Sequence, residues 1–264
     1  MTTQSAPSLL QCLRLQHRVL HALLLREVIT RFGRKNLGVL WLIGEPMLFT
    51  LGVTTLWTAA GLHPGSPIPI VAFAVTGYSS VLLWRNSASH AAGAVAQNKP
   101  LLFHRNVQVL DVLLTRILLE MGGATASFIM LSLLFIFVGW MPPPVDLLQV
   151  LSGWLMLAWF GAGLALMIGA GTALSAIVER VWPPAAYLLF PLSGAAFMVD
   201  WLPLGMQKFV LLLPMVHATE MLREGFFGNV APTHYDVGYM ASCCLVLSIV
   251  GLYLVRQASQ RLEF

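Results

Sequence analysis

Residues 147–178 read LLQVLSGWLMLAWFGAGLALMIGAGTALSAIV, and no charged side chain interrupts this run. A helix needs about 20 mostly apolar residues to cross the roughly 30 Å hydrocarbon core of a bilayer. Only helices and closed barrels satisfy their backbone hydrogen bonds in lipid, and a barrel would require short strands of alternating polarity. The run therefore predicts a membrane-spanning helix in an all-α protein.

The composition of the whole chain supports the same class. Of its 264 residues, 58% are hydrophobic and 10% are charged, and the mean hydropathy is +0.78. A soluble domain carries about 25% charged residues, so these few charges could not cover a soluble surface. The composition excludes a soluble enzyme, a disordered chain and a nucleic-acid-binding protein, although the isoelectric point is near 9.2.

Six apolar runs are candidate membrane spans. The second and the fifth are short for a bilayer, and the fourth is long enough to tilt. In chain order the runs are Leu37–Ala60, Ile68–Trp84, Gly122–Trp140, Leu147–Val178, Pro184–Val199 and Val237–Val255. The predicted fold is an all-α polytopic membrane protein with six transmembrane helices, which places both termini on the same side.

The basic residues indicate which side that is. Except for Lys208 and Arg223, every Lys and Arg precedes the first span, follows the sixth, or lies in the connections after the second and fourth spans. Cytoplasmic loops carry the excess of Lys and Arg in membrane proteins. We therefore expect both termini to be cytoplasmic.

The segment before the first span has the pattern of a surface helix. In residues 9–32, leucines recur at helical spacing and are interleaved with arginines. Such a helix lies along a membrane near anionic headgroups, although the pattern also fits a helix packed on a neighbouring domain. We divide the chain into a cytoplasmic amphipathic interfacial segment, 1–36, and a six-helix transmembrane domain, 37–264.

Two connections have a pattern of their own. The chain between the second and third spans is polar and is interrupted at Lys99-Pro100, which predicts two short helices that project from the membrane. Residues 201–216 are apolar but too short to span, and Pro203 and Pro214 divide them. Interrupted helices are tolerated at membrane depth only where their backbone packs against protein or lines a water-filled cavity. We predict re-entrant outer helices between spans five and six.

Three charged residues lie in or near the predicted spans. Glu45, just before Pro46, is inside the first run, where an ionised group usually faces a partner or a wet path. Arg116 and Glu120 are four residues apart, the spacing of an ion pair on one helix face. We favour a structural role for all three, an intramembrane pair or brace, over transport chemistry.

Small residues recur at every fourth position in the fourth run. Gly161, Ala165 and Gly169 form a ridge that lets helix backbones approach closely. The ridge fits packing inside one subunit as well as a contact between two copies. The sequence alone leaves both readings open.

The sequence gives little support for an enzyme. No Gly-Lys-Ser or Gly-Lys-Thr is present, so the chain has no phosphate-binding P-loop. Ser193 and His217 resemble a serine–histidine pair, but Pro191 stands where a Gly-x-Ser-Gly motif needs glycine. The acidic residues predicted on the outer side of the membrane are scattered along the sequence. This spacing fits solvated loops better than the clustered acids of an enzyme that acts on glycans. We predict no catalytic residue and no metal site.

Several motifs carry a family resemblance. Residues 25–38 (LREVITRFGRKNLG), followed by Trp41-Leu42 and Glu45-Pro46, resemble the opening of type-2 ABC transporter permeases. The similarity is greatest to the inner-membrane permease that exports capsular polysaccharide in Gram-negative bacteria. It continues through NKPLL at 98–102, the stretch 193–203 and EMLREGFFG at 220–228. The resemblance thus runs from about residue 20 to the C-terminus.

The resemblance implies a transporter subunit of the bacterial inner (cytoplasmic) membrane. A second copy of the chain would complete a conduit, and separate cytoplasmic P-loop ATPase subunits would bind ATP and Mg²⁺, leaving this chain without a cofactor. The substrate would be an acidic, lipid-linked polysaccharide, passed on to periplasmic and outer-membrane export components. No nucleic-acid partner is expected.

The resemblance also suggests roles for individual residues. Coupling to the ATPase falls to Gln97, Asn98, Lys99, Pro100, Leu101 and Leu102. Contacts at the cytoplasmic interface fall to Arg26, Arg31, Arg34 and Lys35. The candidate substrate path combines rings able to stack on sugars, a cation near the second span's cytoplasmic end, and the outer motif: Tyr78, Trp84, Arg85, Glu220 and Arg223.

Two alternatives remain open at this point. Exporters of O-antigen or teichoic acid share much of the pattern, so the mechanism is better defined than the substrate. An ion-coupled secondary transporter would require paired broken helices in an internal repeat. Only the fifth span, broken at Pro191, fits that description, with Glu45-Pro46 as the nearest counterpart.

Overall fold

The structure is a computed structural model that describes residues 9–32, 37–61, 68–102, 107–230 and 232–262. Every secondary-structure element in these ranges is a helix, which confirms the predicted all-α class. The α-helices are α1 (Leu9–Phe32), α2 (Leu37–Ala59), α3 (Ile70–Ala91), α4 (Ala94–Gln97), α5 (Lys99–Leu102), α6 (Val109–Val138), α7 (Leu147–Leu174), α8 (Ala176–Leu192), α9 (Leu204–Val210), α10 (Pro214–Phe227) and α11 (Val237–Leu262). Two 3₁₀ turns, η1 (Val199–Trp201) and η2 (Gly228–Val230), flank α9 and α10.

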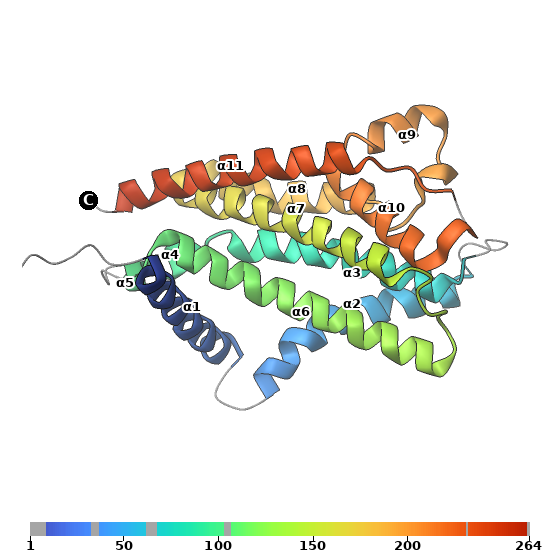
Figure 1. Ribbon diagram of the computed structural model, residues 1–264, viewed down its shortest axis with the longest axis horizontal. Helices are drawn as coiled ribbons and strands as arrows, with labels where there is room; N and C mark the ends of the chain where they lie inside the picture. The colour runs from blue at the N-terminus through green and yellow to red at the C-terminus, as the bar shows by residue number, and fades with distance from the viewer. Residues whose placement is uncertain (1–8, 33–36, 62–67, 103–106, 231, 263–264) are drawn as a thin grey trace, which may run out of the picture.

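The long helices form one elongated bundle (Figure 1). At its core, α3 and α7 pack against each other, with α6 and α2 beside α3 and with α10 and α11 beside α7. Helices α1, α4 and α5 and the end of α11 lie at one end of the bundle, and α9 and α10 at the other (Figure 1). We call these the α1 end and the α9 end.

Four of the described helices are long and apolar enough to cross a membrane. They lie at Leu40–Ala59, Val109–Val138, Leu147–Leu174 and Val237–Arg261, in the places of the first, third, fourth and sixth predicted runs. Helices α3 and α8 take the places of the two short runs; α8 has 17 residues, and α3 carries polar side chains such as Arg85. The membrane class is confirmed, and the count of six spans stays a prediction.

The predicted boundary between the fourth and fifth runs was wrong. The fourth run was expected to reach Val178, but α7 ends at Leu174 and α8 already begins at Ala176. Ser175 has an extended backbone, and its hydroxyl accepts the Ile177 N–H at 3.3 Å, so it caps α8. The apolar sequence continues across this break, so hydropathy alone could not locate it. The prolines inside α8 indicated a later start.

The small-residue ridge of α7 packs inside the subunit. A Cβ added to Gly161 would lie 3.0 Å from the Trp84 Cα of α3, and one added to Gly169 would lie 3.0 Å from the Ala91 carbonyl oxygen. Ala165, between them, is fully buried. The ridge therefore brings the α3 and α7 backbones together, the first of the two readings that the sequence left open.

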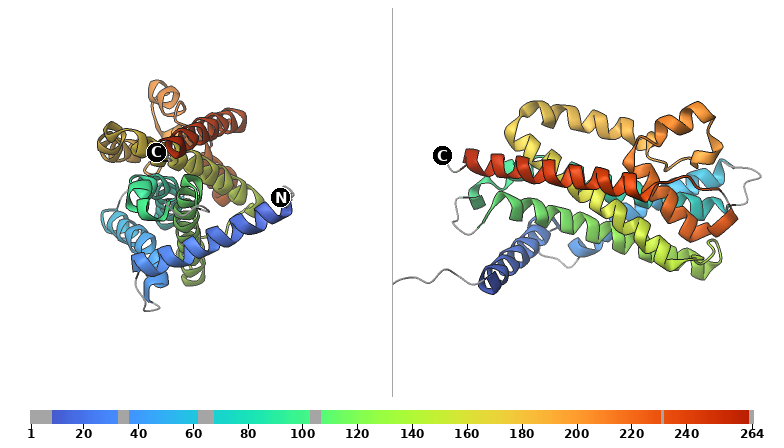
Figure 2. Two further views of the ribbon diagram at one scale, coloured as in Figure 1. Left: turned by 90° about the vertical axis from the view of Figure 1, so that its left-hand side faces the viewer. Right: turned by 45° about the horizontal axis from the view of Figure 1, so that its top comes forward.

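Helix α1 lies across the α1 end of the bundle instead of running along it (Figure 2). It packs on α6 and α2, with Leu23 and Glu27 on its buried side. Its outward side exposes arginines together with Leu15, Leu25 and Ile29. This mixed surface is compatible with the predicted interfacial helix.

We predict that Gly153→Ala destabilises the bundle. A Cβ at Gly153 would lie 2.7 Å from the backbone nitrogen of Leu222, so α7 and α10 would have to separate. Overpacking of this kind costs about 1–3 kcal/mol, more than the roughly 1 kcal/mol that alanine gains over glycine in a helix. Thermal unfolding in detergent measures the loss as a lower melting temperature.

Gly122→Ala on α6 is the matched control, because nothing lies within 4 Å of its added Cβ. That variant should melt at the wild-type temperature or slightly above it. Equal melting temperatures for the two variants would contradict the close approach of α7 and α10.

Candidate coupling site

A tight turn places α4 after α3. Gly93 has a positive φ of 73°, a conformation that favours glycine, and its N–H donates to the Thr172 hydroxyl of α7 at 3.1 Å. Helix α4 then packs on α6 and α7. The segment proposed for coupling is thus fixed to the end of two long helices.

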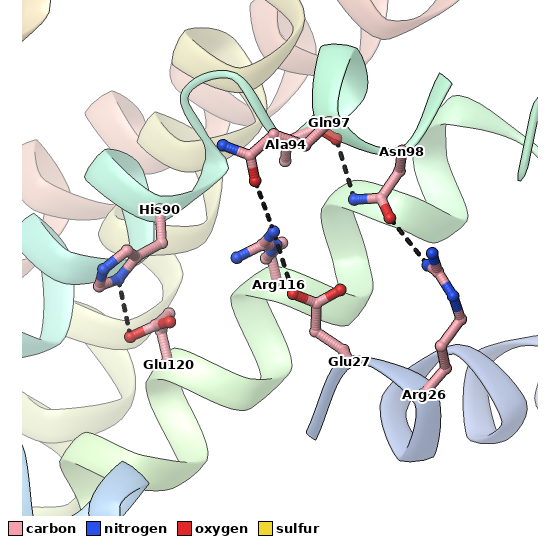
Figure 3. A network of polar contacts seen from close by, with 8 residues as sticks. All are labelled: Arg26, Glu27, His90, Ala94, Gln97, Asn98, Arg116 and Glu120. Atoms are coloured by element: carbon pink, nitrogen blue, oxygen red, sulfur yellow. Dashed lines mark hydrogen bonds and ion pairs between the residues drawn. The ribbon is translucent and has the colours of Figure 1, made fainter. Parts of the chain in front are cut away.

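Asn98 joins α4 to α1 (Figure 3). It is buried, its amide nitrogen donates to the Ala94 carbonyl at 3.0 Å, and its amide oxygen accepts from Arg26 Nη1 at 2.9 Å. Asn98 therefore caps α4 and holds a side chain of α1 with the same group.

Arg116 lies at the centre of the contacts in Figure 3. Its Nη2 lies 3.0 Å from Glu27 Oε1 of α1 and donates to Gln97 Oε1 of α4 at 2.9 Å. The side chains of Arg116 and Glu27 are each 10% exposed. Removing one partner of a buried ion pair leaves an uncompensated charge, so each of these residues requires the other.

A second polar contact lies one turn further along α6. His90 Nδ1 at the end of α3 is 3.0 Å from Glu120 Oε2, and the Glu120 side chain is buried (Figure 3). We refer to the contacts among Arg26, Glu27, Gln97, Asn98 and Arg116 as the α1–α4–α6 network. Together with this second pair, the network fixes α1, α3, α4 and α6 to one another.

The predicted coupling residues divide into two groups. Gln97, which is exposed, and Asn98, which is buried, contact other helices through the network. In α5, Lys99 and Pro100 are exposed, and Leu101 and Leu102 are partly exposed. An exposed cation, a proline and two leucines offer a surface to a partner. The inner pair connects that surface to α1 and α6.

Other predicted residues are placed as follows. Arg26 of the cytoplasmic interface contacts Asn98, while Arg34 and Lys35 lie outside the described residues, as does the side chain of Arg31. Glu45 is exposed on α2 and makes no hydrogen bond or ion pair with a residue that the structure describes. Glu27 and His90 were not predicted. Glu27 follows Leu23 by one helical turn, a spacing that could have placed it on the buried side.

The aromatic part of the predicted path is only partly brought together. Tyr78 lies among rings of α2 and α8, with its centroid 6.0 Å from Phe49, 5.4 Å from Trp57 and 5.5 Å from Phe190. Trp84 is buried, and its ring packs on Phe160 of α7 at 6.1 Å. Tyr78 and Trp84 thus contact different neighbours.

Arg223 is fully buried at the α9 end. Its guanidinium donates to the carbonyls of Gly194 and Phe197 at 2.6 Å and of Ala195 at 2.9 Å, and lies 3.9 Å from the Phe73 ring centroid. A Cβ at Gly77 would come within 2.6 Å of Arg223 Nη2, so α3 needs glycine there. Arg223 ties α10 to the chain after α8.

Glu220, one turn before Arg223, is also buried. Its carboxylate accepts the Val199 N–H at 3.3 Å and the His234 N–H at 3.2 Å. In this structure Glu220 and Arg223 hold the segments around α10 at the α9 end together through backbone groups.

Tyr235 lies in the loop between α10 and α11. Burial and the nearby Glu224 carboxylate raise the pKa of Tyr235, and its hydroxyl accepts a hydrogen bond from Gln149 at 3.1 Å.

The serine–histidine pair considered from the sequence does not form. The Ser193 hydroxyl donates to the Phe190 carbonyl at 2.6 Å. The His217 ring contacts the Leu211 carbonyl at 2.7 Å and accepts the Asp236 N–H at 2.9 Å, so both of its nitrogens are occupied. Nor do the described residues contain a group of three or more His, Cys, Asp or Glu side chains that could hold a metal.

The chain matches a known family over most of its length. A family model described as ABC-2 type transporter covers residues 18–227. The chain belongs to the ABC-2 type transporter family. It is 42% identical to the capsule polysaccharide export inner-membrane protein CtrC of Neisseria meningitidis serogroup A, over 97% of each chain.

Further curated relatives carry similar names. The capsule polysaccharide export inner-membrane protein BexB of Haemophilus influenzae is 39% identical over 96% of each chain. The polysialic acid transport protein KpsM of Escherichia coli is 28% identical over 91% of this chain and 93% of the relative. This member of the ABC-2 type transporter family therefore spans nearly the whole length of proteins named for polysaccharide export or transport.

We predict that Glu27 and Arg116 are energetically coupled. Glu27→Ala leaves the buried guanidinium without its carboxylate and should destabilise the protein by about 3–5 kcal/mol. The double variant Glu27→Ala/Arg116→Met should lose clearly less than the sum of the single variants, because no unpaired charge remains. A double-mutant cycle from thermal unfolding in detergent measures this difference.

Glu179→Ala on α8 is the control, since it removes an exposed glutamate. It should stay within about 0.5 kcal/mol of wild type. Additive losses in the double-mutant cycle would contradict a buried pair between α1 and α6.

Proposed function

We propose that this chain is the transmembrane subunit of an ATP-driven exporter that moves capsular polysaccharide across the bacterial inner membrane. The observation that carries the proposal is the identity of 42% to a capsule polysaccharide export inner-membrane protein over 97% of both chains. Similarity over nearly the full length of both chains supports a shared architecture. The chain performs no catalysis of its own.

The proposed topology has six spans, formed by α2, α3, α6, α7, α8 and α11. Both termini are cytoplasmic, and α9 and α10 form the re-entrant outer hairpin. The excess of Lys and Arg near the α1 end supports this orientation. Residues 1–36 are then the interfacial segment and 37–264 the transmembrane domain.

Energy comes from other chains in this proposal. Two copies of the permease form the conduit, and two cytoplasmic P-loop ATPase subunits bind ATP with Mg²⁺, since this sequence has no P-loop. The exposed surface of α5 contacts the ATPase. Movement of that surface reaches α1 and α6 through the α1–α4–α6 network, because its polar contacts join these helices.

The proposed substrate is an acidic, lipid-linked polysaccharide, as the name of the polysialic acid transport relative suggests. Tyr78 and Arg85 remain proposed path residues, and periplasmic and outer-membrane components would receive the polymer. O-antigen or teichoic acid is the alternative cargo. The ion-coupled transporter now has less support, because ABC-2 family membership favours ATP as the energy source.

Affinity purification of the chain from its native membrane in mild detergent tests this function. A P-loop ATPase should co-purify in roughly equal amount and show vanadate-sensitive turnover, and deletion of the chain should remove surface polysaccharide. The proposal fails if crosslinking in intact membranes before extraction also detects no ATPase.

We predict that Pro100→Asp abolishes ATPase association while the permease still inserts. Pro100 is exposed on α5, and a carboxylate there would have to be desolvated in the contact. The readout is the amount of ATPase that co-purifies per permease.

Pro142→Asp provides the matched control. It makes the same substitution at an exposed proline in the α6–α7 connection, near the opposite end of the bundle. Normal ATPase recovery with Pro100→Asp, or equal loss with both variants, would count against α5 as the contact.

A further inference from the structure

Arg85 is a cation whose only contacts within the described chain are with aromatic rings. Its guanidinium carbon lies 5.2 Å from the ring centroid of Tyr187 and 5.5 Å from that of Phe190, both on α8. No hydrogen bond or ion pair joins Arg85 to another described residue. The five N–H donors of this guanidinium are therefore available to a ligand.

Arg85 is partly exposed on α3, directly after the second predicted run, Ile68–Trp84. Arginine keeps its charge at neutral pH, and its planar guanidinium matches a carboxylate or a phosphate. Stacking on aromatic rings contributes about 0.5–1 kcal/mol at an exposed site but supplies no counter-charge. An anion that reaches this surface can therefore pair with Arg85.

The neighbouring face of α8 is open and carries acceptors. Tyr187 is 69% exposed, and Pro184 and Pro191 are exposed on the same side at helical spacing. Because Pro191 has no N–H, the Tyr187 carbonyl lacks the donor that a helix normally supplies four residues later. Tyr187 therefore offers an exposed ring beside the Arg85 guanidinium and a carbonyl oxygen without its helical donor.

We propose that Arg85, Tyr187 and Phe190 form a subsite for an acidic sugar residue of the transported polymer. A carboxylate or phosphate on the sugar pairs with the Arg85 guanidinium, and the sugar ring stacks on Tyr187. A sugar hydroxyl donates to the Tyr187 carbonyl. This inference rests on the proposed export function, and it specifies which residues select an acidic sugar over a neutral one.

The exposed ring of Tyr187 favours a sugar over a lipid headgroup as the occupant, and a row of buried rings supports the subsite from within. Phe190 contacts Tyr78, which contacts Trp57, which contacts Phe73, with centroids 5.4–6.0 Å apart, and Phe73 lies 5.1 Å from the partly exposed Trp201. The row leads from Arg85 towards the α9 end, where η1 lies (Figure 1). The inner rings of Tyr78, Trp57 and Phe73 are buried in the core, so the exposed ring of Tyr187 is the one open to a ligand. A headgroup would use only the cation, whereas a sugar residue can also stack on Tyr187.

Binding of defined probes to the full-length chain with its co-purified ATPase, in nanodiscs of phosphatidylcholine, tests the subsite. The probes are a fluorescent oligosialic acid, the same oligosaccharide with its carboxylates reduced to alcohols, and the reduced form carrying phosphate esters. Wild type should bind an anionic probe about tenfold more tightly than the neutral one. The anion that gives the larger preference identifies the group recognised.

The variants separate the roles of charge and ring. Arg85→Gln should abolish the preference, Arg85→Lys should keep part of it, and Tyr187→Ala should weaken all three probes about tenfold while Tyr187→Phe does not. Arg256→Gln, which removes an exposed arginine from α11, should leave the preference unchanged.

Several results would overturn the inference. An unchanged preference in Arg85→Gln would do so, and so would equal losses in Arg85→Gln and Arg256→Gln, which would indicate diffuse charge attraction. In nanodiscs with phosphatidylglycerol, a variant that loses bound lipid by native mass spectrometry but keeps its probe preference would assign Arg85 to a lipid.

The proposed function can fail separately from this subsite. If ATPase co-purifies and wild type binds the probes without any charge preference, or binds none, only the subsite is wrong. If no ATPase is found even after crosslinking in membranes, the export function fails and the subsite with it.

Discussion

The buried ion pair between Glu27 and Arg116 is the contact on which the α1 end of the molecule depends. It joins a helix that lies across the bundle to one that runs along it, and the same guanidinium reaches Gln97 of α4. A buried charge is tolerated only when its partner is in place. The position of α4 is therefore linked to that of α1, although 72 residues separate Arg26 from its partner Asn98.

Three arginines have three kinds of partner, and the first two of them are buried. Arg116 has a carboxylate, and Arg223 has three backbone carbonyls and the face of Phe73. Arg85 has two rings and no acceptor among the described residues. The first two arrangements supply oxygen acceptors to the guanidinium. The third supplies none, which is the reason to assign it a ligand.

These contacts suit the task proposed for the chain. The network makes the α1 end a unit that can receive movement from a partner, while Glu220 and Arg223 secure the chain segments before and after α10 at the α9 end. Between these ends, the rings from Phe190 to Trp201 join α8, α3 and α2 to η1. The buried rings thus connect the two ends of the bundle through its core.

The sequence by itself determined the all-α membrane class, four of the spans and the family, because apolar length and local motifs are properties of consecutive residues. It also pointed to Gln97 and Asn98. It missed the break at Ser175, since the apolar run continues through it, and it gave no reason to join Glu27 to Arg116 or Arg85 to Tyr187. Such pairs lie far apart in the chain, and only helix packing decides which side chains meet. The tertiary structure likewise decided that Trp84, Glu220 and Arg223 are buried. The sequence could not decide this, because aromatic and charged residues can also line an open substrate path.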